Sequence, residues 1–151
     1  MKNEITHIGF EARFKRIEDI KEYLDFIVKK YDDRNLAVTD CLIYPRKYQS
    51  EIPFSLDSQT LCRMNADKAS FEALKMEAYP DKASSAKIET YDDYKKSSCG
   101  LLLLIYDMFV IEIYCKDGDG LNELIFNVSR YDLEYFDEKT EENDPRIRMS
   151  F

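Results

Sequence analysis

The chain has 151 residues, enough for one domain with a buried core, since a chain of about this length typically buries roughly 70% of its unfolded surface. Apolar residues make up 44% and charged residues 34%, with four glycines and four prolines, which is typical of a globular protein and argues against long disordered linkers. The formal net charge of −8 disfavours nucleic acid and anionic membranes as partners, because both are bound through clustered Lys and Arg. We therefore expect one globular domain over residues 1–151.

The first predicted elements are a strand, a helix and a second strand. Apolar residues alternate with polar ones over residues 4–12, which predicts a strand. Over residues 17–31 the apolar residues recur at spacings of three and four, and charged residues fill the opposite side, which predicts an amphipathic helix. Turn-forming residues 32–35 follow, and residues 36–44 are predicted to form a strand that ends at Pro45.

The middle of the chain gives weaker signals. Residues 45–53 are polar and irregular and predict a surface loop, while residues 54–70 favour no element. Residues 71–79 fit either a strand or the end of a helix, and their alternation of apolar and charged residues favours the strand. Thr90, followed by acidic residues, is typical of a helix N-cap and predicts a short helix over residues 91–97.

The strongest structural signal is the apolar stretch at residues 101–115. A continuous apolar run is broken at Asp107 and Met108, and alternation with polar residues such as Glu112 follows the break. This pattern predicts a hairpin in which a buried strand turns back as a half-buried one. We expect the hairpin to form the centre of the core.

The C-terminal part predicts a turn, a helix and two strands. The acidic, glycine-containing residues 117–120 predict a turn before an amphipathic helix at residues 121–128, with Asp119 as the candidate N-cap. A strand is predicted to begin at Leu133, and the alternation at residues 147–151 predicts a terminal strand.

The order of these elements predicts an α+β fold with a mainly antiparallel sheet and two or three helices packed on it. Two split β-α-β units, as in ferredoxin-like folds, are one arrangement that agrees with this order. No internal repeat and no low-complexity segment is present in the sequence.

Candidate catalytic residues are few. Any acid-base mechanism that uses imidazole has to use His7, because it is the only histidine. A nucleophilic arrangement of Cys99 or Cys115 with His7 and Asp107 agrees with the residue types but not with any recognisable spacing. His7 lies in a predicted strand, so we favour a structural role for it and assign no catalytic residue.

No metal or cofactor site is predicted. The four cysteines are widely spaced and lack the Cys-x-x-Cys pairs of zinc sites, so we expect reduced, packed thiols in a cytosolic protein. Residues 117–120 fail both registers of a helix-loop-helix calcium loop, which favours a turn. The chain also contains no glycine loop of the kind that cradles phosphate and no Gly-x-Ser-x-Gly motif.

The most unusual charge feature is the segment 132–144, in which seven acidic residues stand against one base, Lys139. Most acidic runs are solvated surfaces, but acids beside aromatic rings also bind basic protein surfaces, since complementary charge steers the encounter and buried rings supply affinity. The candidate binding residues are Tyr135, Phe136, Asp137, Glu138, Glu141, Glu142 and Asp144.

We expect from these features a non-catalytic acidic interaction protein, of the inhibitor or immunity type, that binds a basic protein partner. The alternative is a small enzyme or ligand-binding module with a pocket lined by Tyr and Cys side chains. A third reading is a structural domain that self-associates through an exposed sheet edge. The first residues contain no apolar run typical of a signal peptide, which predicts a cytoplasmic location.

Four short segments carry a resemblance to a known family. They are residues 88–91, residues 97–99 at the entry to the apolar strand, residues 114–117 and residues 142–146. Over residues 88–151 the chain resembles a small uncharacterised bacterial family, a domain of unknown function. The resemblance implies a cytosolic bacterial protein and transfers no catalytic residue.

Overall fold

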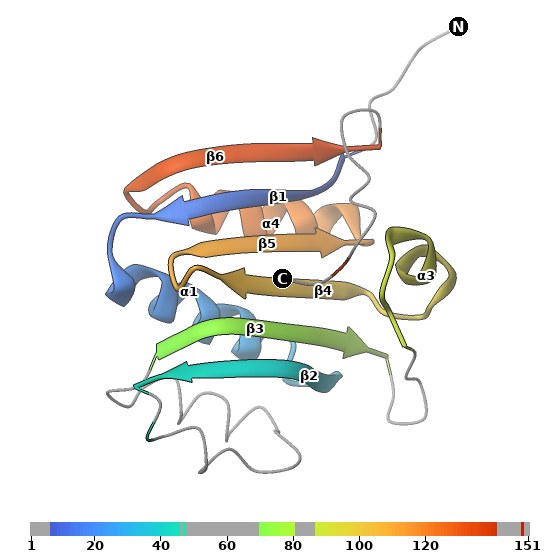
Figure 1. The fold of residues 1–151 in the computed structure, drawn as a ribbon. Coiled ribbons are helices and arrows are strands. Elements are labelled where there is room, and N and C mark those ends of the chain that lie inside the picture. The colour runs from blue at the N-terminus through green and yellow to red at the C-terminus, as the bar shows by residue number, and fades with distance from the viewer. Residues whose placement is uncertain (1–6, 46, 48–69, 81–86, 142–148, 150–151) are drawn as a thin grey trace, which may run out of the picture.

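The protein is described by a computed structural model that covers residues 7–45, 47, 70–80, 87–141 and 149. In these residues six strands form one sheet, and every paired set of strands is antiparallel. Three helices accompany the sheet (Figure 1). The α+β class and the antiparallel sheet are therefore confirmed.

The strand order across the sheet is β2-β3-β4-β5-β1-β6, so β2 and β6 form its two edges. Along the chain the elements are β1 (His7–Phe14), α1 (Ile17–Lys30), β2 (Asn35–Tyr44), β3 (Ser70–Tyr79), α3 (Tyr91–Lys96), β4 (Leu101–Tyr106), β5 (Val110–Cys115), α4 (Gly118–Val128) and β6 (Leu133–Thr140). Each strand and helix predicted within the described residues is found. Most of the predicted loop at 45–53, all but the last of the ambiguous residues 54–70 and most of the predicted terminal strand lie outside them.

The connections contain one split β-α-β unit. Strands β5 and β6 run parallel with β1 between them, and α4 connects them. The connection from β1 through α1 to β2 instead passes three intervening strands. A ferredoxin-like arrangement has one strand between the two strands of each split unit, so β5-α4-β6 follows it, whereas β1 and β2 are further apart than it requires.

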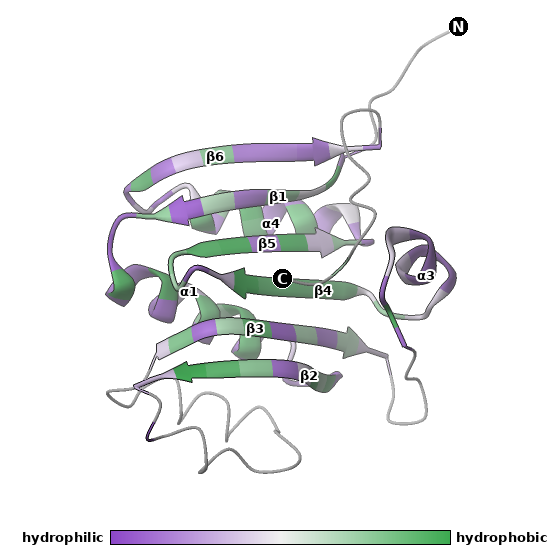
Figure 2. Cartoon of the chain, in the orientation of Figure 1, coloured by the Kyte–Doolittle hydropathy of each residue, from purple (hydrophilic) through white to green (hydrophobic). Residues whose placement is uncertain are grey.

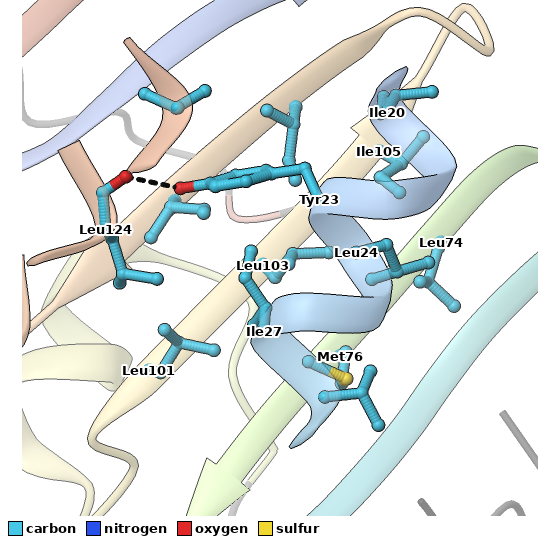
Figure 3. Packing of buried hydrophobic residues seen from close by; sticks show 14 of the residues in the cluster. Ile20, Tyr23, Leu24, Ile27, Leu74, Met76, Leu101, Leu103, Ile105 and Leu124 are labelled. Carbon is cyan, nitrogen blue, oxygen red and sulfur yellow. Dashed lines mark hydrogen bonds between the residues drawn. The ribbon is translucent and has the colours of Figure 1, made fainter. Parts of the chain in front are cut away.

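Helices α1 and α4 cover one face of the sheet (Figure 1). The apolar stripe of α1, including Leu24 and Ile27, packs on the alternate residues of β4 that point to this face (Figure 3). The buried Tyr23 hydroxyl donates a hydrogen bond of 2.7 Å to the Leu124 carbonyl and so joins the two helices. This face is the main hydrophobic core, as the periodicity of α1 predicts.

The opposite face of the hairpin is buried as well. Here α3, tyrosine side chains and Met149 form a second cluster, in which Tyr114 and Leu102 are fully buried. Strand β5 is therefore buried along its whole length, and the prediction that it is half-buried is wrong. The hairpin's own sequence contains no sign of these covering side chains, because they come from other parts of the chain.

Local sequence signals explain two helix starts. Thr90 caps α3 as predicted, since its side chain accepts a hydrogen bond of 3.1 Å from the Asp93 amide. The Asp93 carboxylate in turn accepts a hydrogen bond from the Thr90 amide. Helix α4 begins earlier than predicted, at Gly118, and its N-cap is Asp117, whose carboxylate accepts from the Gly120 amide at 3.2 Å. Asp119, the predicted cap, lies instead in the first helical turn.

Candidate functional site

A row of three acidic side chains crosses β6, β1 and β5 on the face opposite α1 and α4. In the strand register Glu11 is directly opposite Asp137 on one side and Glu112 on the other. Directly opposite residues in antiparallel strands point to the same face, with Cβ atoms about 5 Å apart. We call Asp137, Glu11 and Glu112 the carboxylate row.

The carboxylate row runs from solvent into the protein. Asp137 is exposed, Glu11 is half-buried and Glu112 is completely buried. The row is extended and does not converge on one point, and no group of three His, Cys, Asp or Glu side chains among the described residues is arranged to hold a metal ion.

Tyrosine hydroxyls flank Glu11 on both sides. Tyr106 donates to Glu11 Oε1 at 2.5 Å and Tyr135 donates to Glu11 Oε2 at 2.7 Å. Burial, and then the hydrogen bond to the Glu11 carboxylate, raise the pKa of both tyrosines well above the ordinary value. These hydroxyls therefore stay protonated at neutral pH, so they act as donors and not as general bases.

The buried end of the row has its own donors. The Tyr114 hydroxyl donates to Glu112 Oε1 at 2.8 Å, and Lys139 Nζ lies 3.6 Å from the same oxygen. Lys139 is the single base of the acidic segment, and its side chain is only 14% exposed. It therefore points inward over the sheet toward Glu112.

Strand β6 divides the predicted binding residues between two faces. Tyr135 and Asp137 point to the face of the carboxylate row. Phe136 and Glu138 point to the helix side, where the Phe136 ring stacks on Phe10 with ring centroids 5.4 Å apart. Because neighbouring strand residues alternate between faces, the segment cannot present all of its acids on one surface.

The remaining predicted binding residues lie at and beyond the end of β6. Glu141 is exposed and accepts a hydrogen bond of 3.0 Å from the Tyr91 hydroxyl. Glu142 and Asp144 lie outside the described residues. The structure thus brings Tyr135 and Asp137 together with Glu11 and Glu112, two acids from outside the segment 132–144 that are not among the predicted binding residues.

The cysteine, histidine and aspartate that could be combined into a nucleophilic site do not converge. His7 is exposed on β1, where its Nδ1 lies 2.6 Å from Glu138 Oε2. Asp107 lies in the turn between β4 and β5, whereas Cys115 is at the far end of β5. Five residues of strand, about 17 Å, separate that turn from Cys115.

The three cysteines in the described part of the chain are held in the unreactive thiol form. Burial raises the pKa of Cys41 and of Cys99 to about 12, and it raises the pKa of Cys115 as well. A thiol needs a lowered pKa to be a nucleophile at neutral pH. The tyrosine and cysteine side chains of the second cluster pack against one another as part of the core.

A second buried acid, Glu77 on β3, lies on the same face of the sheet as the carboxylate row. Its side chain is 1% exposed, accepts a hydrogen bond from the Tyr79 hydroxyl and has Oε2 3.9 Å from Lys75 Nζ. Burial outweighs these stabilising contacts and raises the pKa of Glu77.

Glu77→Gln is expected to stabilise the protein at about pH 8 and to have little effect at about pH 4. A raised pKa in the folded state means that the native state holds a proton that the unfolded state has lost, so stability falls as the pH rises above the unfolded value of about 4.3. Glutamine is neutral and keeps an acceptor for Tyr79. Urea unfolding of both proteins across this pH range measures the difference, and a variant that is less stable at pH 8 would contradict the assignment.

The match to known proteins is to uncharacterised ones. Residues 54–150 match a family model described as "Protein of unknown function (DUF2691)". A curated relative, "Uncharacterized protein YncE" of Bacillus subtilis (strain 168), is 32% identical over 77 residues, which are 51% of this chain and 50% of YncE. The chain thus aligns with about half the length of this relative. No solved structure matches the chain.

The family match extends further toward the N-terminus than the resemblance at residues 88–151 and includes β3 to β6. It therefore contains Glu112 and Asp137 but not Glu11, which lies on β1. In the described part of the chain no helix has the length and apolar character needed to cross a bilayer.

Proposed function

We propose that this chain, which belongs to the DUF2691 family of proteins of unknown function, binds a basic protein partner without catalysing a reaction. In this proposal the chain acts in the cytoplasm as an inhibitor or immunity protein would. The observation that carries the proposal is the carboxylate row, Asp137, Glu11 and Glu112.

A positive charge beside Asp137, at the exposed end of the carboxylate row, would stabilise the row. Like charges directly opposite each other in a sheet are destabilising. At the inner end, Glu112 accepts a hydrogen bond from Tyr114 and lies near Lys139. Glu11 accepts hydrogen bonds from two tyrosines. Asp137, in contrast, has no ion-pair partner among the described residues. An Arg or Lys side chain of a partner would relieve the repulsion there and stack beside the Tyr135 ring.

Binding is favoured over catalysis by the protonation states of the nearby groups. The tyrosine hydroxyls are held protonated, and the buried thiols have raised pKa values. Neither is then available as a base or a nucleophile at neutral pH. Tyrosine rings beside carboxylates are, in contrast, common contributors to protein interfaces.

Neutralising Asp137 and Glu11, the two outer members of the carboxylate row, should weaken binding of a basic probe. We expect the double variant Glu11→Gln/Asp137→Asn to bind a short Lys- and Arg-rich peptide about tenfold more weakly than the wild type, since each lost charge contact at a partly exposed site contributes up to about 1 kcal/mol. Isothermal titration calorimetry at low ionic strength measures the affinity.

The matched control is Asp33→Asn/Asp40→Asn, which makes the same charge change in the turn after α1 and on β2. This variant should bind the peptide as the wild type does. Equal weakening in both double variants would show a general effect of net charge, and the proposed site would then be wrong.

A further inference from the structure

The outer side of β6 is a long strand edge. Among the described strands β6 pairs with β1 only, and its eight residues include no proline. At about 3.3 Å per residue this edge extends for roughly 26 Å. An edge of this length is a template for pairing with another extended chain, because half of the backbone N–H and C=O groups of an edge strand point away from the sheet.

The charges along this edge are almost all negative. Glu134, Asp137 and Glu138 are exposed, and Figure 2 shows β6 as hydrophilic along most of its length. Lysine side chains on edge strands commonly prevent pairing with another chain. The lysine of β6, Lys139, is instead directed toward Glu112. The exposed rim of β6 therefore carries acids on both faces of the sheet.

We propose that the basic partner binds as an extended strand, which pairs with the outer edge of β6 and continues the sheet. This inference rests on the proposed function and names its mode of recognition. Main-chain hydrogen bonds to β6 supply affinity, and opposite-charge pairs between neighbouring strands supply selectivity.

The same charges disfavour a second copy of this chain as the occupant. Two β6 strands that paired edge to edge would bring acids beside acids, and like charges directly opposite each other are destabilising. A basic strand would instead place Lys or Arg side chains beside the acids of β6. The edge is thus complementary to a segment of a different protein.

The alternation of β6 also indicates the pattern of the partner's side chains. Asp137 and Glu138 are adjacent in sequence and point to opposite faces of the sheet. A partner strand satisfies both if it carries two neighbouring basic residues, one over each face. His7, whose Nδ1 lies 2.6 Å from Glu138 Oε2, makes an exposed contact that an Arg or Lys side chain of the partner can replace.

Two peptides of equal charge test the proposal. The first has a central Lys-Arg pair flanked by Val and Thr, and the second has the same sequence with prolines in place of the two flanking Val residues, because proline cannot donate to a strand ladder. We expect the first to bind about tenfold more tightly and to slow hydrogen exchange at alternate amides of β6, measured by NMR on the full chain.

The outcomes separate this inference from the proposed function. If both peptides bind equally, with affinity that depends on Asp137 and without protection of β6 amides, strand pairing is overturned and the basic partner stands. If neither binds at low ionic strength, both proposals fail. Concentration-dependent dimerisation that protects β6 without any peptide would show a second copy as the occupant and would overturn the inference.

Discussion

Gly9→Ala is expected to lower the free energy of unfolding by about 3 kcal/mol, at the upper end of what overpacking usually costs. A Cβ added at Gly9 would lie 1.9 Å from the Ile113 carbonyl oxygen and 2.9 Å from its carbonyl carbon. Both atoms are backbone at the centre of the sheet, so β1 and β5 would have to move apart. Chemical denaturation measures the loss, and thermal unfolding should show a decrease in melting temperature of about 10 °C.

Gly118→Ala is the matched control. Gly118 is the first residue of α4, and nothing lies within 4 Å of the Cβ that the substitution adds. Alanine there should be neutral or stabilise the protein by about 0.5 kcal/mol, because it restricts the unfolded chain. A Gly9→Ala protein as stable as the wild type would contradict the close approach of β1 and β5, and with it the position of Glu11 beside Glu112.

The elements that were predicted well have signals contained in one segment of sequence. The spacing of three and four in α1 directly reflects the stripe that packs on the sheet, with Leu24 and Ile27 fully buried. The hairpin is similar, because the break at Asp107 and Met108 coincides with two residues of positive φ, 55° and 63°, that turn the chain. Local geometry determines both features, so local sequence predicts them.

The carboxylate row depends on information that no single segment contains. Alternation places Glu11 and Glu112 on the faces of their own strands, but their proximity requires that β1 lies next to β5. More than ninety residues separate β1 from β5 in the chain, and strand order arises from the packing of the complete sheet. Without the strand order, the sequence indicates which acids are close along the chain but not which acids are close in space.

The acidic segment shows a different limit. Once Leu133 is taken as the start of a strand, the two-residue period already requires Asp137 and Glu138 to point to opposite faces. Charge composition taken without that period groups these acids into one binding surface. The strand pattern changes the expected partner from a generally basic surface to a segment with neighbouring basic residues.

Lys139→Ala is expected to destabilise the protein by about 3 kcal/mol, since removal of one member of a buried ion pair leaves the other charge buried without it. Glu112 is completely buried, and Lys139 Nζ lies 3.6 Å from its carboxylate. Chemical denaturation at neutral pH measures the loss. Lys139→Arg keeps the cation and should recover most of the stability.

The double variant Glu112→Gln/Lys139→Met distinguishes a charge effect from a loss of packing. Both side chains keep nearly their original volume and neither carries a charge, so this protein should be close to the wild type in stability. If the double variant is as unstable as Lys139→Ala, the lysine stem and not its charge supports the sheet. If the expected result holds, the charge of Lys139 compensates the buried charge of Glu112, and the inner end of the carboxylate row is stabilised within the chain itself.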